Sequence, residues 1–145
     1  MQTIVLVPCG KRKQHSNTPI EAENMYIGSF FKKAMLCAKS MKPDAIYILS
    51  AKYHVVPPEK KLEYYDMVLS KQSASFRRKW AETVLSQLNA LGVNLQDDKI
   101  VFLTGQYYYN DIIGHIKNYD IVGKGLSIGC KIQKFNEIIK KNYKK

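Results

Sequence analysis

The chain has few acidic residues and few cysteines. The first shortage bears on the partners it can bind, and the second on disulfides and metal sites. Its 145 residues include 12 Asp and Glu against 23 Lys and Arg, which gives a net charge of +11. Such an excess favours polyanionic partners, because Lys and Arg neutralise phosphates and release counterions. The three cysteines (Cys9, Cys37 and Cys130) form no C-x-x-C pair. We therefore expect no disulfide framework and no metal site.

Long apolar runs and the common nucleotide motifs are also missing. No stretch approaches the roughly 20 apolar residues that cross a membrane, and the first residues lack the basic start of a secretory signal. The sequence contains no P-loop, no G-x-G-x-x-G and no G-x-S-x-G, which argues against P-loop enzymes, dinucleotide cofactors and α/β-hydrolases. We expect a cytoplasmic protein with no cofactor and no membrane partner.

Apolar β-branched segments alternate with helical patterns along the chain, without a linker or an internal repeat. This alternation favours right-handed parallel crossovers, with helices on both faces of a sheet. We therefore predict one α/β domain over residues 1–145, a three-layer sandwich with a mainly parallel four-stranded sheet. The predicted strands cover residues 3–7, 45–49, 100–103 and 119–122.

Helical periodicity predicts which side chains of each helix point inward. The clearest helix begins at an N-terminal cap, Ser73, and ends near residue 91, with apolar residues at a spacing of four. A further helix is expected over residues 26–41, and a last one is capped by Ser127 and turns Ile128 inward. Residues 77–79 should be exposed on the clearest helix, and its buried residues should be Phe76, Trp80, Val84 and Leu88.

Lysines stand a few residues after the ends of the first two predicted strands. In α/β folds the carboxyl ends of the strands are where ligands bind. We expect these two strands to be parallel neighbours that bring Lys11, Ser50 and Lys52 to one pocket. The two lysines would hold a phosphate or a developing oxyanion there.

Asp66 is the one carboxylate near these residues in the sequence, and it is the candidate general base or cation stabiliser. The long connection before it is expected to fold Tyr65 and Asp66 over the loop of residues 9–13, because ordered long loops are usually functional. Tyrosine rings can stack on a base, and the run of residues 107–109 must leave at least one ring exposed or in a pocket. Asp66, Lys52 and Lys11 are therefore the predicted catalytic residues.

These residues together resemble a family of short bacterial and phage proteins known as a domain of unknown function. Its pattern is C-G-K-x-K, Y-x-G-x-x-F, L-S-A-K-Y-G and Y-D, and here these motifs begin at Cys9, Tyr26, Leu49 and Tyr65. The resemblance covers nearly the whole chain. The family is distantly similar to the peroxide-stress YaaA proteins and to the P-C-x-x-x-K-P-Y domain of archaeosine synthase. That similarity implies a uracil-DNA-glycosylase-like fold and action on a nucleobase.

The chain departs from the family pattern at one position. His54 stands where the family usually has the glycine of L-S-A-K-Y-G. If that glycine supplies a positive φ, the histidine must either adopt the same backbone conformation or reshape the loop.

The leading hypothesis is a nucleobase-directed enzyme that cleaves an N-glycosidic bond, or modifies or transfers a base, in nucleic acid or a nucleotide. The alternatives are a non-catalytic nucleic-acid-binding protein and a small-nucleotide-binding protein of a defence or counter-defence system. The expected partner is a nucleic acid or a nucleotide, and the protein is a monomer or a dimer. The predicted substrate-binding residues are Cys9, Gly10, Lys13, Tyr26, Gly28, Ser50, Tyr53, Tyr65, Thr104, Gly105 and Ser127.

Overall fold

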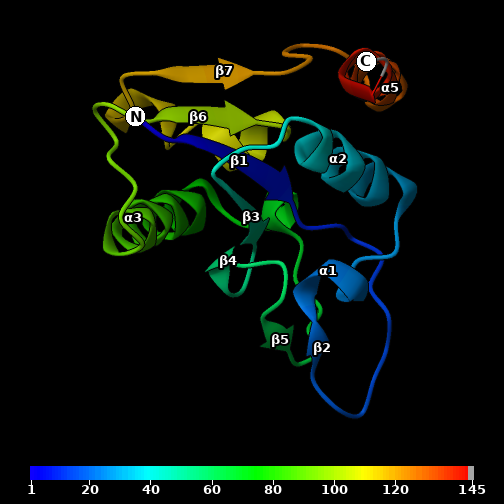
Figure 1. Cartoon of the computed structure of the whole chain (residues 1–145). Coiled ribbons are helices and arrows are strands. Elements are labelled where there is room, and N and C mark those ends of the chain that lie inside the picture. Colours follow the sequence, from blue (N-terminus) through cyan, green and yellow to red (C-terminus); the bar gives the residue numbers. More distant parts are fainter. Residues whose placement is uncertain (144–145) are drawn as a thin grey trace.

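A mainly parallel sheet forms the centre of the computed structural model, which describes residues 1–143 (Figure 1). The strands follow the order β4-β3-β1-β6-β7. Four of them are parallel: β1 (Thr3–Pro8), β3 (Ala45–Ser50), β6 (Lys99–Phe102) and β7 (Tyr119–Ile121). The fifth, β4 (His54–Val56), pairs antiparallel with β3 at the edge of the sheet.

The fold class predicted from the sequence is confirmed as mixed α/β with a mainly parallel sheet, and all four predicted strands are present. The strand count was wrong, because the sheet has five strands and not four. The missed strand, β4, is only three residues long and follows β3 after a tight turn. Such a short segment carries too little periodicity to separate a strand from a loop.

The central strand of the sheet is β1, which lies between β3 and β6. Residues 4–7 of β1 are at most 1% exposed, so both faces of this strand are covered. A strand buried on both faces reads as a continuous apolar run, as is usual in parallel sheets. The sequence of β1, TIVLVP, has this form and sets the position of the loop that follows it.

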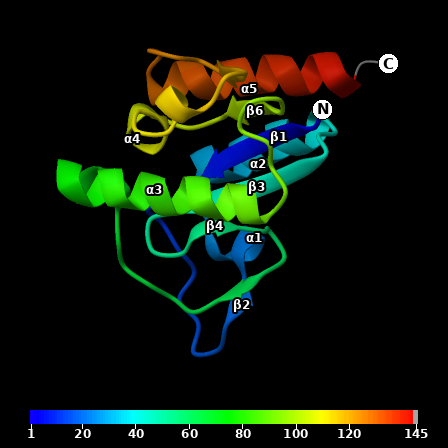
Figure 2. The same ribbon diagram turned by 90° about the vertical axis from the view of Figure 1, so that its left-hand side faces the viewer.

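Helices cover both faces of the sheet. Helix α3 (Ala74–Ala90) lies on one face, and α2 (Ser29–Ser40) and α5 (Ile128–Tyr143) lie on the other (Figures 1 and 2). The rings of Phe30 in α2 and Phe135 in α5 join the last two helices, with centroids 5.5 Å apart. The short elements are α1 (Ala22–Met25), α4 (Gln106–Tyr109), the strand pair β2 (Ile20–Glu21) and β5 (Lys61–Leu62), and two 3-10 helices, Leu69–Lys71 and Ile113–His115.

Helix α3 largely follows the prediction. Ser73 is its N-terminal cap, and its hydroxyl accepts the backbone N–H of Phe76 at 3.0 Å. Trp80, Val84 and Leu88 are buried as expected, but Phe76 is only half-buried. Arg77 is also half-buried, because its guanidinium lies 5.0 Å from the centroid of the Tyr107 ring.

Two other helix predictions need correction. Helix α2 begins at Ser29 and not at Tyr26, which forms an isolated bridge with Lys13 instead. In α5 the side chain of Ile128 is 67% exposed, although periodicity predicted that it points inward. Ser127 does cap this helix, since its hydroxyl accepts the backbone N–H of Cys130 at 3.3 Å.

Over residues 1–143, no helix combines the length and apolar character needed to cross a membrane. Within the same residues, no three His, Cys, Asp or Glu side chains are grouped so that they could hold a metal ion. The three cysteines are free thiols. Burial raises the pKa of the Cys37 thiol to about 11, which fits its place in the core of α2.

Candidate functional site

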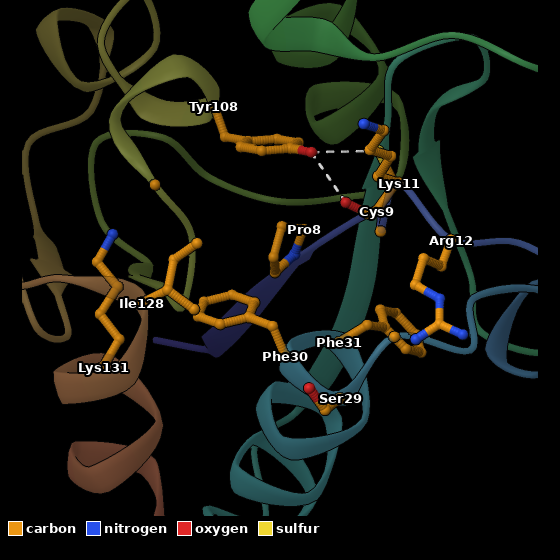
Figure 3. Close-up of a pocket in the computed structure, with 13 residues that line it drawn as sticks. Pro8, Cys9, Lys11, Arg12, Ser29, Phe30, Phe31, Tyr108, Ile128 and Lys131 are labelled. Atoms are coloured by element: carbon orange, nitrogen blue, oxygen red, sulfur yellow. Dashed lines mark hydrogen bonds between the residues drawn. The ribbon is translucent and has the colours of Figure 1, made fainter.

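A cleft of about 410 Å³ lies at the carboxyl ends of β1 and β6. The chain leaves β1 toward β3 on one side and leaves β6 toward β7 on the other, so the two connections diverge here. Such a switch point is where open α/β sheets bind ligands. Four segments line the cleft: residues 8–12 after β1, residues 28–31 at the start of α2, Gly105 with Tyr108 after β6, and Ile128 with Lys131 in α5 (Figure 3).

Cationic side chains lie at both ends of the cleft. Lys131 comes from α5, and Lys11 and Arg12 come from the β1 loop on the other side (Figure 3). Phe30 and Phe31 of α2 lie between them. Of the described residues that line the cleft, none is acidic. The arrangement therefore suits an anionic ligand that also has an apolar, planar part.

Lys131 is the most confined of these cations. Its side chain is half-buried, and desolvation lowers the pKa of its amine. Its Nζ lies 3.7 Å from the position that a Cβ on Gly105 would occupy. The glycine therefore leaves the ammonium group in direct reach of the loop after β6. A Cβ at position 105 would be in ordinary van der Waals contact with this ammonium group.

Tyr108 fixes the opposite wall of the cleft to the β1 loop. Its hydroxyl donates to the backbone carbonyl of Cys9 at 2.9 Å and lies 3.3 Å from the Cys9 Sγ (Figure 3). The Trp80 ring meets the Tyr108 ring edge-on, with centroids 6.1 Å apart. Burial, and then the neighbouring Cys9, raise the pKa of Tyr108, so its phenol stays a neutral donor.

A second polar group lies buried at the ends of β1 and β3. The Tyr65 hydroxyl is 2.6 Å from the Tyr26 hydroxyl and 2.8 Å from the Ser50 hydroxyl. The Lys13 ammonium lies 4.6 Å from the centroid of the Tyr65 ring and donates to the backbone carbonyl of Lys11. We call these four residues (Lys13, Tyr26, Ser50 and Tyr65) the tyrosine network. They are all at most 7% exposed.

Burial has opposite effects on the ionisable groups of the tyrosine network. It raises the pKa of both tyrosines and lowers the pKa of Lys13, because each charged form loses hydration. Within residues 1–143 no carboxylate lies within salt-bridge distance of Lys13. Desolvation has the larger effect on its pKa, and the nearby Cys9 and then Asp66 act in the opposite direction and raise it. The hydroxyls of the tyrosine network are therefore neutral and hydrogen-bonded, and Lys13 is its one desolvated cation.

The model of the family of unknown function DUF6884 matches residues 4–137, nearly the whole chain. The chain belongs to this family. The resemblance inferred from the sequence to a domain of unknown function is thereby confirmed at the level of the family. A comparison with curated proteins finds no match.

In this DUF6884 chain, some of the predicted site residues line the cleft and others do not. Lys52 is exposed, with its Nζ 5.3 Å from the centroid of the Tyr53 ring, so the structure does not bring it to the cleft beside Lys11. Asp66 is also exposed and lies outside the cleft lining, near Lys13. The predicted residues that do line the cleft are Cys9, Gly10, Lys11, Gly28 and Gly105.

The other predicted residues have structural positions in the DUF6884 fold. Ser127 caps α5, and Tyr53 packs edge-on against Tyr65 with its hydroxyl near the carbonyl of Glu63. The Thr104 hydroxyl is fully buried and has no hydrogen-bond partner in the described part of the chain. His54 has a φ of +67°, so it adopts the conformation that suits the glycine of the pattern.

Several cleft residues were missed by sequence reasoning. Phe30 and Lys131 carried no usable signal, because a helix face points equally well to solvent. Arg12 belongs to the run of three cations after β1, from which only Lys11 and Lys13 were predicted as site residues. The tyrosine run of residues 107–109 did carry a signal, because at least one of its rings was predicted to be exposed or to lie in a pocket. Tyr107 is 42% exposed, and Tyr108 lines the cleft.

Proposed function

We propose that the cleft binds a nucleotide and that the protein is an enzyme acting on the base, by cleaving the N-glycosidic bond or by modifying or transferring the base. The observation that carries this proposal is the cleft itself, where cations stand on both sides of an aromatic wall and no described lining residue is acidic. Its volume of about 410 Å³ lies in the range of small-molecule sites.

A nucleotide matches both kinds of surface in the cleft. The half-buried ring of Phe30 offers apolar area for a base, whereas the Phe31 side chain is 2% exposed and belongs to the core. Lys11, Arg12 and Lys131 offer charge for phosphate, and the guanidinium of Arg12 can bind two phosphate oxygens at once. The similarity of the family pattern to YaaA and to the archaeosine synthase domain supports base chemistry, and a uracil-DNA-glycosylase-like fold belongs to the same proposal.

Cleavage of an N-glycosidic bond passes through a state with positive charge on the sugar and negative charge on the departing base. Lys11 is the predicted catalytic residue that lines the cleft, and it would neutralise the base or hold the phosphate. Asp66 would stabilise the sugar cation or orient the attacking water. Asp66 lies outside the cleft lining, which does not support this role, and an Asp66→Asn variant tests whether the carboxylate is needed.

Calorimetric titration with a nucleoside monophosphate and with the matching nucleoside tests the binding step. We expect the monophosphate to bind at least about tenfold more tightly, because one charge-assisted phosphate contact contributes about 1.5–3 kcal/mol. Arg12→Gln should remove most of this difference. The control is Lys60→Gln, an exposed lysine beside β5 that removes the same charge far from the cleft. Equal binding of nucleoside and nucleotide would contradict the proposal.

Mass spectrometry of nucleotides and oligonucleotides incubated with the protein tests the chemical step. A free or modified base is the expected product, and Asp66→Asn and Lys11→Ala should both reduce its formation. The net charge of +11 favours a second candidate, a non-catalytic nucleic-acid-binding protein. That candidate predicts Arg12-dependent binding with every base left intact.

A further inference from the structure

We infer that the site takes a nucleotide within a single strand of nucleic acid, and that a hollow beside the cleft binds the next nucleotide of the strand. This inference rests on the proposed function and adds the class of substrate. It is carried by the two charged ends of the cleft, by a second hollow that shares residues with it, and by an exposed aromatic ring in that hollow.

The cations of the cleft lie on both sides of its aromatic wall. Lys131 comes from α5, whereas Lys11 and Arg12 come from the β1 loop (Figure 3). A free nucleoside monophosphate has a phosphate on one side of its sugar only. A nucleotide within a strand has one on each side, so both charged ends of the cleft then have a partner.

The second hollow, of about 480 Å³, opens next to the cleft and shares Gly105 and Lys131 with it. Its other walls include Tyr107, Lys124 and Leu126. Lys131 therefore stands between the two hollows, where the phosphate that links two nucleotides would pass. Of the described residues that line the second hollow, none is acidic.

Tyr107 gives the second hollow a surface for stacking. Its side chain is 42% exposed, and the Arg77 guanidinium lies 5.0 Å from its ring centroid. Arg77 belongs to α3 and is itself held by the carbonyl of Gln72, so the ring is supported from a rigid helix. Bases stack on such aromatic rings with little regard for sequence, for about 1–3 kcal/mol each. Leu126, 44% exposed, adds apolar area nearby.

The bound nucleic acid has to be single-stranded. Bases can reach the rings of Phe30 and Tyr107 only when they are unpaired and unstacked from their neighbours. The excess of positive charge on the chain adds the general attraction for a polyanion, which weakens as salt increases.

The test compares a single-stranded hexanucleotide, its duplex and a nucleoside bisphosphate that carries both 5′ and 3′ phosphates, by calorimetry. We expect the hexanucleotide to bind best, the bisphosphate next and the duplex least. Tyr107→Ala should weaken hexanucleotide binding about tenfold and change bisphosphate binding less than twofold. Tyr107→Phe keeps the ring and should keep the affinity. The matched control is Tyr119→Ala, which removes an equally exposed tyrosine from β7.

Three results would overturn the inference. The hexanucleotide could bind no more tightly than the bisphosphate, the duplex could bind as well as the single strand, or Tyr107→Ala could affect both ligands alike. In each of these cases Arg12-dependent binding of the bisphosphate would leave the proposed nucleotide site standing. If no nucleotide or oligonucleotide bound at all, the proposed function and this inference would both be wrong.

Discussion

Two pairs of tyrosines lie at the carboxyl edge of the sheet, and they are used in opposite ways. Tyr26 and Tyr65, beside β1 and β3, are at most 5% exposed and hydrogen-bond to each other. Tyr107 and Tyr108, after β6, present their rings to a hollow and to the cleft. Both pairs lie at the same edge of the central sheet, so their position at that edge does not explain the difference.

The connections between strands do explain it. At the β1–β3 end the chain returns over the strand ends, and the segment of residues 53–66 covers them and satisfies every hydroxyl of the tyrosine network. At the β1–β6 end the connections diverge and leave space between them. The tyrosines of the closed end are therefore structural here. Those of the open end keep a ring surface that a ligand can reach, even though the Tyr108 hydroxyl is bonded to Cys9.

Trp80→Ala should destabilise both the tyrosine network and the cleft. The Trp80 indole donates to the carbonyl of Ser50 at 2.8 Å, and its ring supports Tyr108. Removing a buried Trp side chain lowers the free energy of unfolding by about 3–5 kcal/mol. Urea unfolding of the variant and the parent measures this loss. Trp80→Phe keeps most of the packing and should cost clearly less. A loss below about 1 kcal/mol for Trp80→Ala would show that α3 does not connect the two regions.

Tyr65→Phe should affect the tyrosine network and leave the cleft unchanged. It removes one hydroxyl and leaves that of Tyr26 without its buried partner, whereas the Ser50 hydroxyl still accepts the backbone N–H groups of Lys52 and Tyr53. An unpaired buried hydroxyl costs about 1–3 kcal/mol. Nucleotide affinity should not change, because none of these residues lines the cleft. The control is Tyr107→Phe, whose stability should stay within about 0.5 kcal/mol of the parent. A Tyr65→Phe protein with full stability and weakened nucleotide binding would reverse our assignment of the two pairs.

Lys13→Met should stabilise the tyrosine network, by about 1 kcal/mol at neutral pH, because a buried cation without a nearby carboxylate is costly. The pKa of Lys13 is lower in the folded chain than in the unfolded one. Unfolding therefore takes up a proton between these two values, and the stability of the parent rises with pH in that interval. The difference in unfolding free energy between variant and parent, measured by urea unfolding, should shrink as the pH rises toward about 10.4, because Lys13 is then neutral in the folded chain.

A variant that is less stable than the parent at neutral pH would mean that Lys13 contributes more through the Tyr65 ring than it loses by burial. Lys11→Met, which removes an exposed lysine two residues earlier, is the matched control and should leave stability within about 0.5 kcal/mol.

His54→Gly is the smallest predicted effect, and it tests the turn that leads from β3 to β4. A non-glycine residue at a φ of +67° costs about 1–2 kcal/mol, and glycine avoids this cost. Glycine also gives the unfolded chain more conformational entropy, which offsets part of the gain in stability. We expect a net gain of about 0.5–1 kcal/mol over His54→Ala, which keeps the Cβ. Thermal unfolding of the two variants measures it. Equal melting temperatures would exclude backbone strain at this position.

The pH dependence of the parent offers a further check on His54. Burial lowers the pKa of its imidazole below the value in the unfolded chain. The unfolded state then binds the proton first, so the parent should lose stability as the pH falls through the range between the unfolded and the folded pKa. His54→Gly should lack this part of the acid loss.

The sequence allowed most of the sheet to be predicted. Continuous apolar runs such as that of β1 mark strands buried on both faces, and the four parallel strands were found in this way. The strand β4 was missed because its three residues are too few for a pattern. Helix α3 was predicted within one or two residues, since its cap at Ser73 and its spacing of four agree.

The site was predictable mainly where its residues follow a strand, and Gly28 at the start of α2 was predicted through the family pattern. Cys9, Lys11 and Gly105 were expected and line the cleft, because the end of a strand fixes where the next residues lie. Lys131 could not be found this way, since it reaches the cleft only through the packing of α5 on α2. The burial of Lys13 was equally hidden, because a lysine in a basic run usually faces solvent.

The edge-on contact between Trp80 and Tyr108 has a practical consequence for whoever looks for the ligand. Trp80 is the only tryptophan of the chain, and the ring it touches forms a wall of the cleft. A molecule that settles against Tyr108 changes the surroundings of this single indole. The intrinsic fluorescence of the unlabelled protein is thus an optical signal for occupancy of the cleft, and candidate ligands can be screened by emission alone.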